Sequence, residues 1–116
     1  MKTIDYNGRK HNVFTLTTEF GQKEVICTEE RYQNCNNLAV ELLVVENGKA
    51  EEPYARLTTN ICPLEDGYAC IDTNNNSWAR QFIKQNKLGK STGNSISSGY
   101  CIYPLYKMDT TKFYEN

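Results

Sequence analysis

The strongest strand signal in the chain is the stretch Leu38-Ala39-Val40-Glu41-Leu42-Leu43-Val44-Val45-Glu46. Aliphatic and β-branched residues of this kind pack well on a pleated surface, and the run is too short for a membrane helix. Asn47-Gly48 follows at once, and this dipeptide tolerates the positive φ angles of a tight turn. The stretch therefore predicts one strand of an antiparallel sheet, followed by a turn and by a partner strand at residues 54–59.

Strand-like residues occupy much of the remaining chain. Residues 2–20 are predicted to form a hairpin, because Asn7-Gly8 suits a two-residue type I′ turn. A strand is also expected around Val25-Ile26-Cys27, with a helix left open as the alternative for residues 28–34. The other predicted strands lie at residues 67–72 and 100–107, and a loop rich in Gly, Ser and Asn is expected at residues 89–99.

One segment is typical of a helix. Asn76 or Ser77 can act as its N-cap, the segment runs to Leu88, and Gly89 follows as the C-cap. One face of this segment carries its apolar side chains, which are Trp78, Ala79, Phe82 and Ile83. The predicted fold class is therefore α+β: a single domain over residues 1–116, with an antiparallel sheet of five or six strands and one main helix at about 77–88 packed on it.

The length and composition exclude several classes of protein. A chain of 116 residues, 11% of them aromatic, can bury a core without a metal or a disulfide, so intrinsic disorder is not expected. No apolar run approaches the roughly 20 residues of a membrane helix, and Met1–Gly8 holds no apolar stretch that could serve as a signal peptide. We therefore expect a cytoplasmic protein with no membrane partner.

The five cysteines are poorly spaced for metal binding. Structural zinc sites use pairs of the type Cys-x(2–4)-Cys, whereas the closest pairs here, 27/35 and 62/70, are eight apart. An odd number of cysteines in a cytoplasmic chain predicts reduced thiols. We expect no metal and no cofactor. The alternative is a site of three cysteines, or of cysteines with a histidine, assembled through space; the cysteines are Cys27, Cys35, Cys62, Cys70 and Cys101.

The net charge of −1 hides a division along the chain. Residues 19–66 hold ten acidic and four basic residues, a local charge of −6, whereas residues 73–108 hold five basic residues and no acidic one, a local charge of +5. The simplest interpretation is that these charges solvate exposed faces. They also define two candidate partner-binding sets. The acidic set, for a basic groove, is Glu29, Glu30, Glu51 and Glu52; the basic set, for RNA phosphates or an acidic protein face, is Arg80, Lys84, Lys87 and Lys90.

Motifs that carry catalysis are missing from the sequence. The segment Gly89–Gly93 resembles the end of a phosphate-binding loop, but it follows a helix and lacks the leading glycine spacing. The pairs Glu29/Glu30 and Glu51/Glu52 are adjacent, so in a regular element their side chains point apart, which is poor geometry for acid–base catalysis. We therefore expect no enzyme activity and no small-molecule substrate. The alternative is an active site assembled through space from His11, the only histidine, and a cysteine.

Several segments of the chain resemble a family of small bacterial proteins of about this length and uncharacterised function. Besides Met1–Gly8, these segments are Pro53–Thr58, Ala69–Asn75, Leu88–Gly93 and Ser98–Tyr106. Tyr32–Glu52 matches least. Members of that family are associated with plasmids, conjugative elements and phages. The resemblance thus implies residence on a mobile genetic element, and it implies no catalytic residues.

Two hypotheses about function follow from this setting and from the charges. The first is a non-enzymatic inhibitor of a host defence complex, of the anti-CRISPR type, which binds a Cas nuclease in its basic nucleic-acid channel or contacts its guide RNA. The alternative is a nucleic-acid-binding accessory protein for maintenance or transfer of the element. From the sequence, inhibition is the main hypothesis, with the acidic set slightly ahead of the basic set as the contact surface.

Overall fold

The computed structural model describes residues 1–61 and 63–115, and over these residues most of the chain is β-strand. The strands are β1 (Thr3–Tyr6), β2 (Arg9–Asn12), β3 (Phe14–Thr18), β4 (Gly21–Arg31), β5 (Leu38–Glu46), β6 (Lys49–Arg56), β7 (Thr58–Thr59), β8 (Tyr68–Ile71), β9 (Gly89–Ser98) and β10 (Cys101–Met108). The helical elements are α1 (Ala79–Asn86) and the short 3₁₀ helix η1 (Thr110–Phe113).

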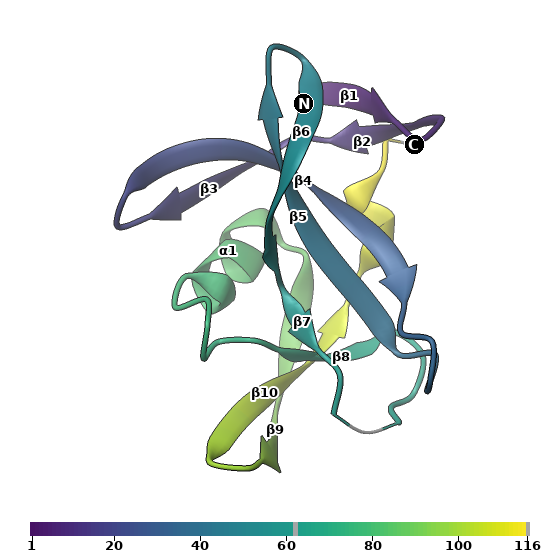
Figure 1. Ribbon diagram of the computed structural model, residues 1–116, viewed down its shortest axis with the longest axis vertical. Coiled ribbons are helices and arrows are strands. Elements are labelled where there is room, and N and C mark those ends of the chain that lie inside the picture. The colour runs from purple at the N-terminus through teal and green to yellow at the C-terminus, as the bar shows by residue number, and fades with distance from the viewer. Residues whose placement is uncertain (62, 116) are drawn as a thin grey trace.

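These strands form two four-stranded antiparallel sheets and a separate hairpin (Figure 1). Sheet B has the order β3-β4-β5-β6, and sheet C has the order β7-β8-β10-β9. The hairpin β1-β2 makes its own two-stranded sheet. Helix α1 contacts β3 of sheet B and β9 of sheet C, so it lies between the two sheets at one side. The long β9–β10 hairpin extends from the body of the molecule (Figure 1).

The two faces of sheet B bury two separate clusters. Alternate side chains of a strand point to opposite faces, and in β5 both sets are buried. Leu38, Val40 and Leu42 join the main core, which also takes residues from sheet C, α1 and η1. On the other face Leu43 and Val45 join a smaller cluster under the β1-β2 hairpin. Burial on both faces explains why this stretch is an almost continuous apolar run.

The predicted fold class, α+β with five or six strands, is wrong. The fold is mostly β, with 58% strand and 11% helix, three sheets and one short α-helix in the part described. The main error lies at residues 89–99, which were expected to be a loop. Gly, Ser and Asn have low strand propensity, but residues 89–98 pair with β10 over almost their whole length. Tertiary pairing therefore overrides local propensity in β9.

The predicted turns at the two Asn-Gly dipeptides are confirmed. Both asparagines and both glycines have positive φ, and they connect Tyr6 to Arg9 and Glu46 to Lys49 as two-residue hairpin loops. The bounds of β5 are those predicted. The partner strand β6 begins directly after its turn, five residues earlier than expected. The helix left open at residues 28–34 is wrong, because β4 continues to Arg31 and pairs with β5.

The helix is present, but it is shorter than predicted and its caps differ. The Asn76 side chain donates to the Arg56 carbonyl at 2.8 Å, so Trp78 occupies the N-cap position without a side-chain cap. At the other end Lys87, not Gly89, adopts the left-handed cap conformation. The predicted apolar face is confirmed for Ala79, Phe82 and Ile83, which are buried, while Trp78 packs at the margin of the core. No helix among the described residues is long and apolar enough to cross a membrane.

Candidate functional site

A hollow on one side of the molecule gathers five lysines from four elements. Its volume is about 820 Å³, and it lies where the end of α1, the start of β9, the end of β10 and η1 meet. That volume is within the range of roughly 300–1,000 Å³ typical of ligand sites. Its lining residues are Lys84, Lys87, Gly89, Lys90, Ser91, Tyr106, Lys107, Met108, Asp109 and Lys112. We call this surface the lysine hollow; five lysines against one carboxylate give its lining a formal charge of +4.

The tight turn after α1 brings lysines from the helix and from β9 to the same place. Lys87 ends the helix with a φ of 56°, and the Leu88 amide donates to the Ile83 carbonyl at 3.0 Å. Leu88 is fully buried, which anchors the turn. A Cβ added at Gly89 would lie only 2.8 Å from the Lys107 carbonyl oxygen. The glycine therefore allows β9 to begin against β10, directly beside the end of the helix.

The floor of the hollow is apolar and packed. Tyr106 and Met108 of β10 are only 6% and 4% exposed. Arg80 Nη1 donates to the Tyr106 hydroxyl at 3.2 Å, and its guanidinium lies 5.8 Å from the ring centroid. Arg80 thus contacts the floor without lining the hollow. Because this floor is packed, the backbone positions from which the lysines project are fixed.

None of the five lysines of the hollow has an acidic side chain as partner among the described residues; Lys107 donates to the Asp66 backbone carbonyl. Lys84, Lys87, Lys90 and Lys112 are exposed, and none forms an ion pair with any residue that the structure describes. The carboxylate of Asp109 is occupied, because it accepts hydrogen bonds from the amide and hydroxyl of Thr111 and so caps η1. Cations held together without counter-charges raise the local concentration of anions. The hollow is therefore suited to an anionic ligand.

Three of the four residues in the predicted basic set line the hollow, and two further lysines were missed. Lys107 was counted in the +5 segment but was not singled out, and Lys112 lies beyond that segment. Several contacts between distant elements bring η1 to this place: the Asp109 amide donates to the Leu88 carbonyl at 2.8 Å, the Asn12 side chain donates to the Lys112 carbonyl at 3.0 Å, and Phe113 is buried in the main core. Nothing in the sequence around Lys112 indicates these contacts.

The structure does not bring the predicted acidic set together. Glu29 and Glu30 pair with Val40 and Ala39 near one end of β5, whereas Glu51 and Glu52 lie on β6 near its other end, where Pro53 pairs with Leu43. Glu30, Glu51 and Glu52 are exposed. Glu51 and Glu52 line a hollow of about 320 Å³ with Lys23, Val44, Glu46, Pro53 and Tyr54. The two pairs therefore belong to different surfaces.

Glu29 has a role within the fold. Its Oε1 accepts a hydrogen bond from the Tyr114 hydroxyl at 2.8 Å, and Arg31 lies 4.0 Å from its other oxygen. Burial, and then this bond to Glu29, raise the pKa of the Tyr114 hydroxyl to about 12. Arg9 covers the Tyr114 ring at 3.4 Å. Glu29 thus ties β4 to the C-terminal segment.

The alternative of a histidine–cysteine active site gains nothing from the geometry. His11 is 5% exposed and lies between the rings of Tyr6 and Tyr114, at 5.5 and 5.0 Å between centroids. The small hollow of about 170 Å³ beside it has no cysteine among its lining residues. Cys27 is fully buried, and burial raises the pKa of its thiol.

The other cysteines are equally dispersed. Cys70 is buried, and Cys35 and Cys101 are half-buried. Cys62 lies outside the described residues. Within residues 1–61 and 63–115 no group of three His, Cys, Asp or Glu side chains is arranged to hold a metal.

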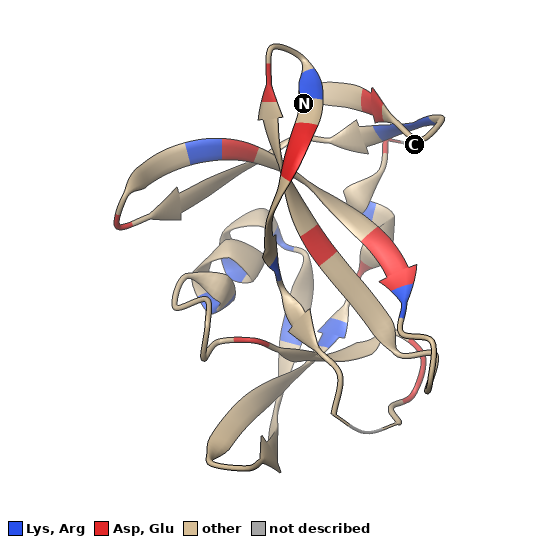
Figure 2. Ribbon diagram, viewed as in Figure 1, with Lys and Arg blue, Asp and Glu red and all other residues tan. Residues whose placement is uncertain are grey.

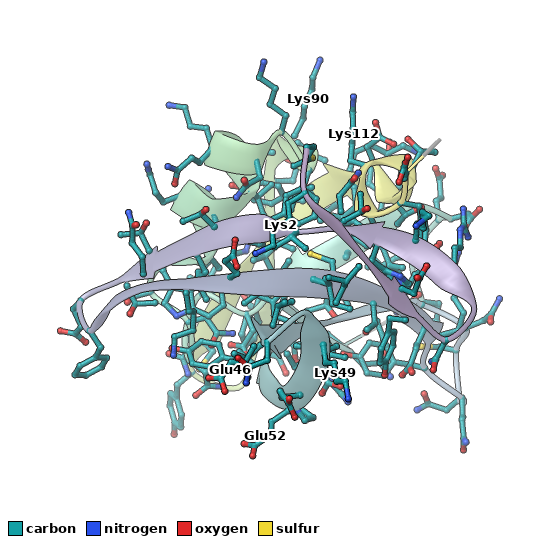
Figure 3. The ribbon with its side chains drawn as sticks, turned by 90° about the horizontal axis from the view of Figure 1, so that it is seen from above. Lys2, Glu46, Lys49, Glu52, Lys90 and Lys112 are labelled. Atoms are coloured by element: carbon teal, nitrogen blue, oxygen red, sulfur yellow. The ribbon has the colours of Figure 1, made fainter. Side chains whose placement is uncertain are left out.

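The charge division seen along the sequence is also a division in space. Figure 2 shows basic residues on α1 and acidic residues on β4, β5 and β6. Figure 3 shows Lys90 and Lys112 projecting from one side of the molecule, and Glu46 and Glu52 from the opposite side. The second side is mixed, because Lys49 projects there as well. The lysine side is the more uniform of the two.

The comparison with protein families gives one match. Residues 27–116 match the family described as "Domain of unknown function (DUF4313)". Because the match covers more than half of the 116 residues, the chain belongs to this uncharacterised family. Neither the search of curated proteins nor the search of solved structures finds a match.

Proposed function

We propose that the protein is a non-enzymatic accessory protein of a mobile genetic element that binds nucleic acid through the lysine hollow. The observation that supports this proposal best is the convergence of Lys84, Lys87, Lys90 and Lys112, all exposed and without acidic partners among the described residues. Phosphate contacts from lysine supply most of the sequence-independent affinity for nucleic acids. The ligand is then a phosphate backbone, and the place of action is the bacterial cytoplasm.

The resemblance described above supplies the mobile-element part of this proposal. Plasmids, conjugative elements and phages all pass through stages in which their nucleic acid must be bound during maintenance or transfer. A small protein with a cationic hollow, and with no catalytic group assembled among the residues that the structure describes, suits such a role. In the proposal the hollow acts by binding alone.

A second candidate function is inhibition of a host defence complex, such as a Cas nuclease. The observation in its favour is the opposite placement of charge in Figure 3, with Glu46 and Glu52 on one side and Lys90 and Lys112 on the other. In this proposal the acidic side competes for a basic nucleic-acid channel, or the lysine hollow contacts the guide RNA. Inhibition would follow stoichiometry, since a binder does not turn over. Full activity of a panel of Cas nucleases with excess protein, added before or after guide loading, would exclude it.

Binding of labelled oligonucleotides tests the first proposal. We expect the parent protein to bind a 15-residue oligonucleotide in a fluorescence anisotropy titration at low salt. The four-lysine variant, with Lys84→Gln, Lys87→Gln, Lys90→Gln and Lys112→Gln, is expected to lose this binding. The matched control is a three-glutamate variant with Glu46→Gln, Glu51→Gln and Glu52→Gln, which is expected to bind as the parent does. Equal affinities for the parent and the four-lysine variant would contradict the proposal.

A further inference from the structure

Sheet C has one face in the core; on the other, which we call the open face, Cys70 is buried and the residues around it are half-buried or exposed. In β10 the buried residues Tyr106 and Met108 point into the core and to the floor of the lysine hollow. The alternate residues Tyr103, Leu105 and Lys107 point to the opposite face, and each of them is half-buried or exposed. Among the described residues, β9 packs mainly against β10 and α1, and β10 packs mainly against β8 and β9.

Two tyrosines lie on this open face. Tyr68 of β8 pairs directly with Lys107, and Ile96 of β9 pairs with Tyr103. Because paired residues share a face, Tyr68, Tyr103 and Lys107 lie on the same face of β8 and β10. Tyr103 and Lys107 are four residues apart, so the two rings are separated by roughly 13 Å along the strand. Both rings are half-buried, which fixes their bodies and leaves part of each ring accessible.

Lys107 joins the open face to the lysine hollow. The residue Lys107 is one of those that line the hollow, while its side chain points to the tyrosine face, where its Nζ lies 4.7 Å from the centroid of the Tyr68 ring. The same Nζ donates to the Asp66 carbonyl at 3.4 Å. Lys107 and Lys90, which pairs with it in the edge strand β9, therefore lie where the edge of sheet C separates the hollow from the tyrosine face.

We infer that the ligand of the lysine hollow is single-stranded nucleic acid, whose bases stack on Tyr68 and Tyr103 while its phosphates lie among the lysines. This inference rests on the proposed function, since it names the ligand of the same site. Bases can reach an aromatic side chain only where they are unpaired, and stacking on a sheet surface is tolerant of sequence. A duplex would present phosphates to the hollow, but its bases would remain stacked on one another.

Acidic groups beside the rings favour binding with the bases toward the tyrosines and the phosphates toward the lysines. Asp66 carries an ion pair to Arg31 at 3.0 Å and follows directly after Glu65 in the loop before Tyr68. Asp72 lies near enough to Tyr103 to act on it electrostatically. The Asp72 carboxylate repels phosphates from the part of the open face beside Tyr103. A strand that crosses it would therefore turn its bases inward and keep its backbone toward Lys90, Lys107 and the hollow.

The test compares single strands with a duplex. Labelled 15-residue oligothymidine and oligouridine, and a 15-base-pair DNA duplex, are titrated with the parent protein and with a variant carrying Tyr68→Leu and Tyr103→Leu. We expect the parent to bind both single strands about ten-fold more tightly than the duplex, and the double variant to lose about ten-fold for the single strands only. The DNA and RNA probes then show whether the 2′-hydroxyl contributes. Melting curves confirm that each variant is folded.

Two controls separate the tyrosines from general effects. Tyr68→Phe with Tyr103→Phe keeps both rings and is expected to bind like the parent; it remains informative if the leucine variant fails to fold. Phe20→Leu removes a ring that is 87% exposed on the β3–β4 turn, and it is expected to change nothing. Lysine-dependent binding that is equal for single strand and duplex and unaffected by the leucine substitutions would overturn this inference and leave the proposed function standing. Loss of lysine dependence would overturn both.

Discussion

The lysine hollow and the acid-bearing strand β6 lie on opposite sides of the protein, and they are built differently (Figure 3). The hollow takes its lysines from α1, β9, β10 and η1, and these elements meet over a packed floor. The acidic side takes Glu51 and Glu52 from one edge strand and includes Lys23 and Lys49 nearby. In the sequence the two regions are charged to a similar extent. The charge of a sequence segment thus predicts the sign of a surface, whereas the topology decides whether the charged side chains lie close together.

The largest expected effect comes from removing the support of the hollow. Phe82 is 2% exposed and meets Phe14 and Trp78 edge to face, at 6.3 and 6.0 Å between centroids. Phe82→Ala should therefore lower the free energy of unfolding by about 3–5 kcal/mol, through lost burial and a cavity. Lys84→Gln, on the exposed face of the same helix, should leave the free energy unchanged. An unaltered denaturation midpoint for Phe82→Ala would break the assignment of α1 as the platform of the hollow.

A smaller loss of stability is expected at the joint between α1 and β9. In Gly89→Ala the new Cβ would lie 2.8 Å from the Lys107 carbonyl oxygen and 2.9 Å from the Met108 sulfur. The backbone oxygen cannot move without disturbing the β9–β10 pairing, so we expect a cost of about 1–3 kcal/mol. Chemical denaturation of this variant should be compared with Ser95→Ala, which lies exposed on the same strand. Equal stability of both variants would show that the close approach is not needed.

The acidic side should tolerate substitution. Glu51 and Glu52 are exposed and form no ion pair with the residues that the structure describes. Replacing both by glutamine should therefore change the free energy of unfolding by less than about 0.5 kcal/mol. Thermal melting measures this directly. A large loss of stability would mean that the carboxylates of Glu51 and Glu52 have a structural role, as that of Glu29 does.

The role of Glu29 gives a prediction about alkaline pH. The pKa of the Tyr114 hydroxyl is raised from 10.0 to about 12 in the folded protein, so the folded state holds this proton more tightly than the unfolded state does. The corresponding stability is present below pH 10 and is lost as the pH rises through about 12. Tyr114→Phe should reduce the loss of stability between these pH values. Identical pH profiles for both proteins would contradict the Tyr114–Glu29 contact.

Much of the fold can be predicted from local patterns, and the failures share one cause. The continuous apolar run of β5 and the turns at Asn7-Gly8 and Asn47-Gly48 depend on adjacent residues, and these predictions are confirmed. The strand β9 depends on pairing with β10, and the small polar residues of β9 carry no sign of it. The position of η1 likewise depends on contacts with distant residues, among them Leu88 and Asn12.

The candidate site shows the same limit. Lys84, Lys87 and Lys90 lie close together in the sequence, so a local pattern was enough to find them. Arg80 has the right charge and helical spacing, but its side chain is directed to Tyr106. Lys112 reaches the hollow only because the chain folds back after β10. Sequence reasoning missed the residues that only the tertiary fold brings to the hollow.

The measurement that tests the central claim most directly is the salt dependence of oligonucleotide affinity. If Lys84, Lys87, Lys90 and Lys112 neutralise four phosphates of a single strand, a plot of log K against log salt concentration should have a slope of about −3 for the parent protein, from about 0.7 counterions released per contact. The four-lysine variant, which keeps Lys107, should have a slope between zero and about −0.7. Equal slopes for the two proteins would contradict the account, because the affinity would then come from cations outside the lysine hollow.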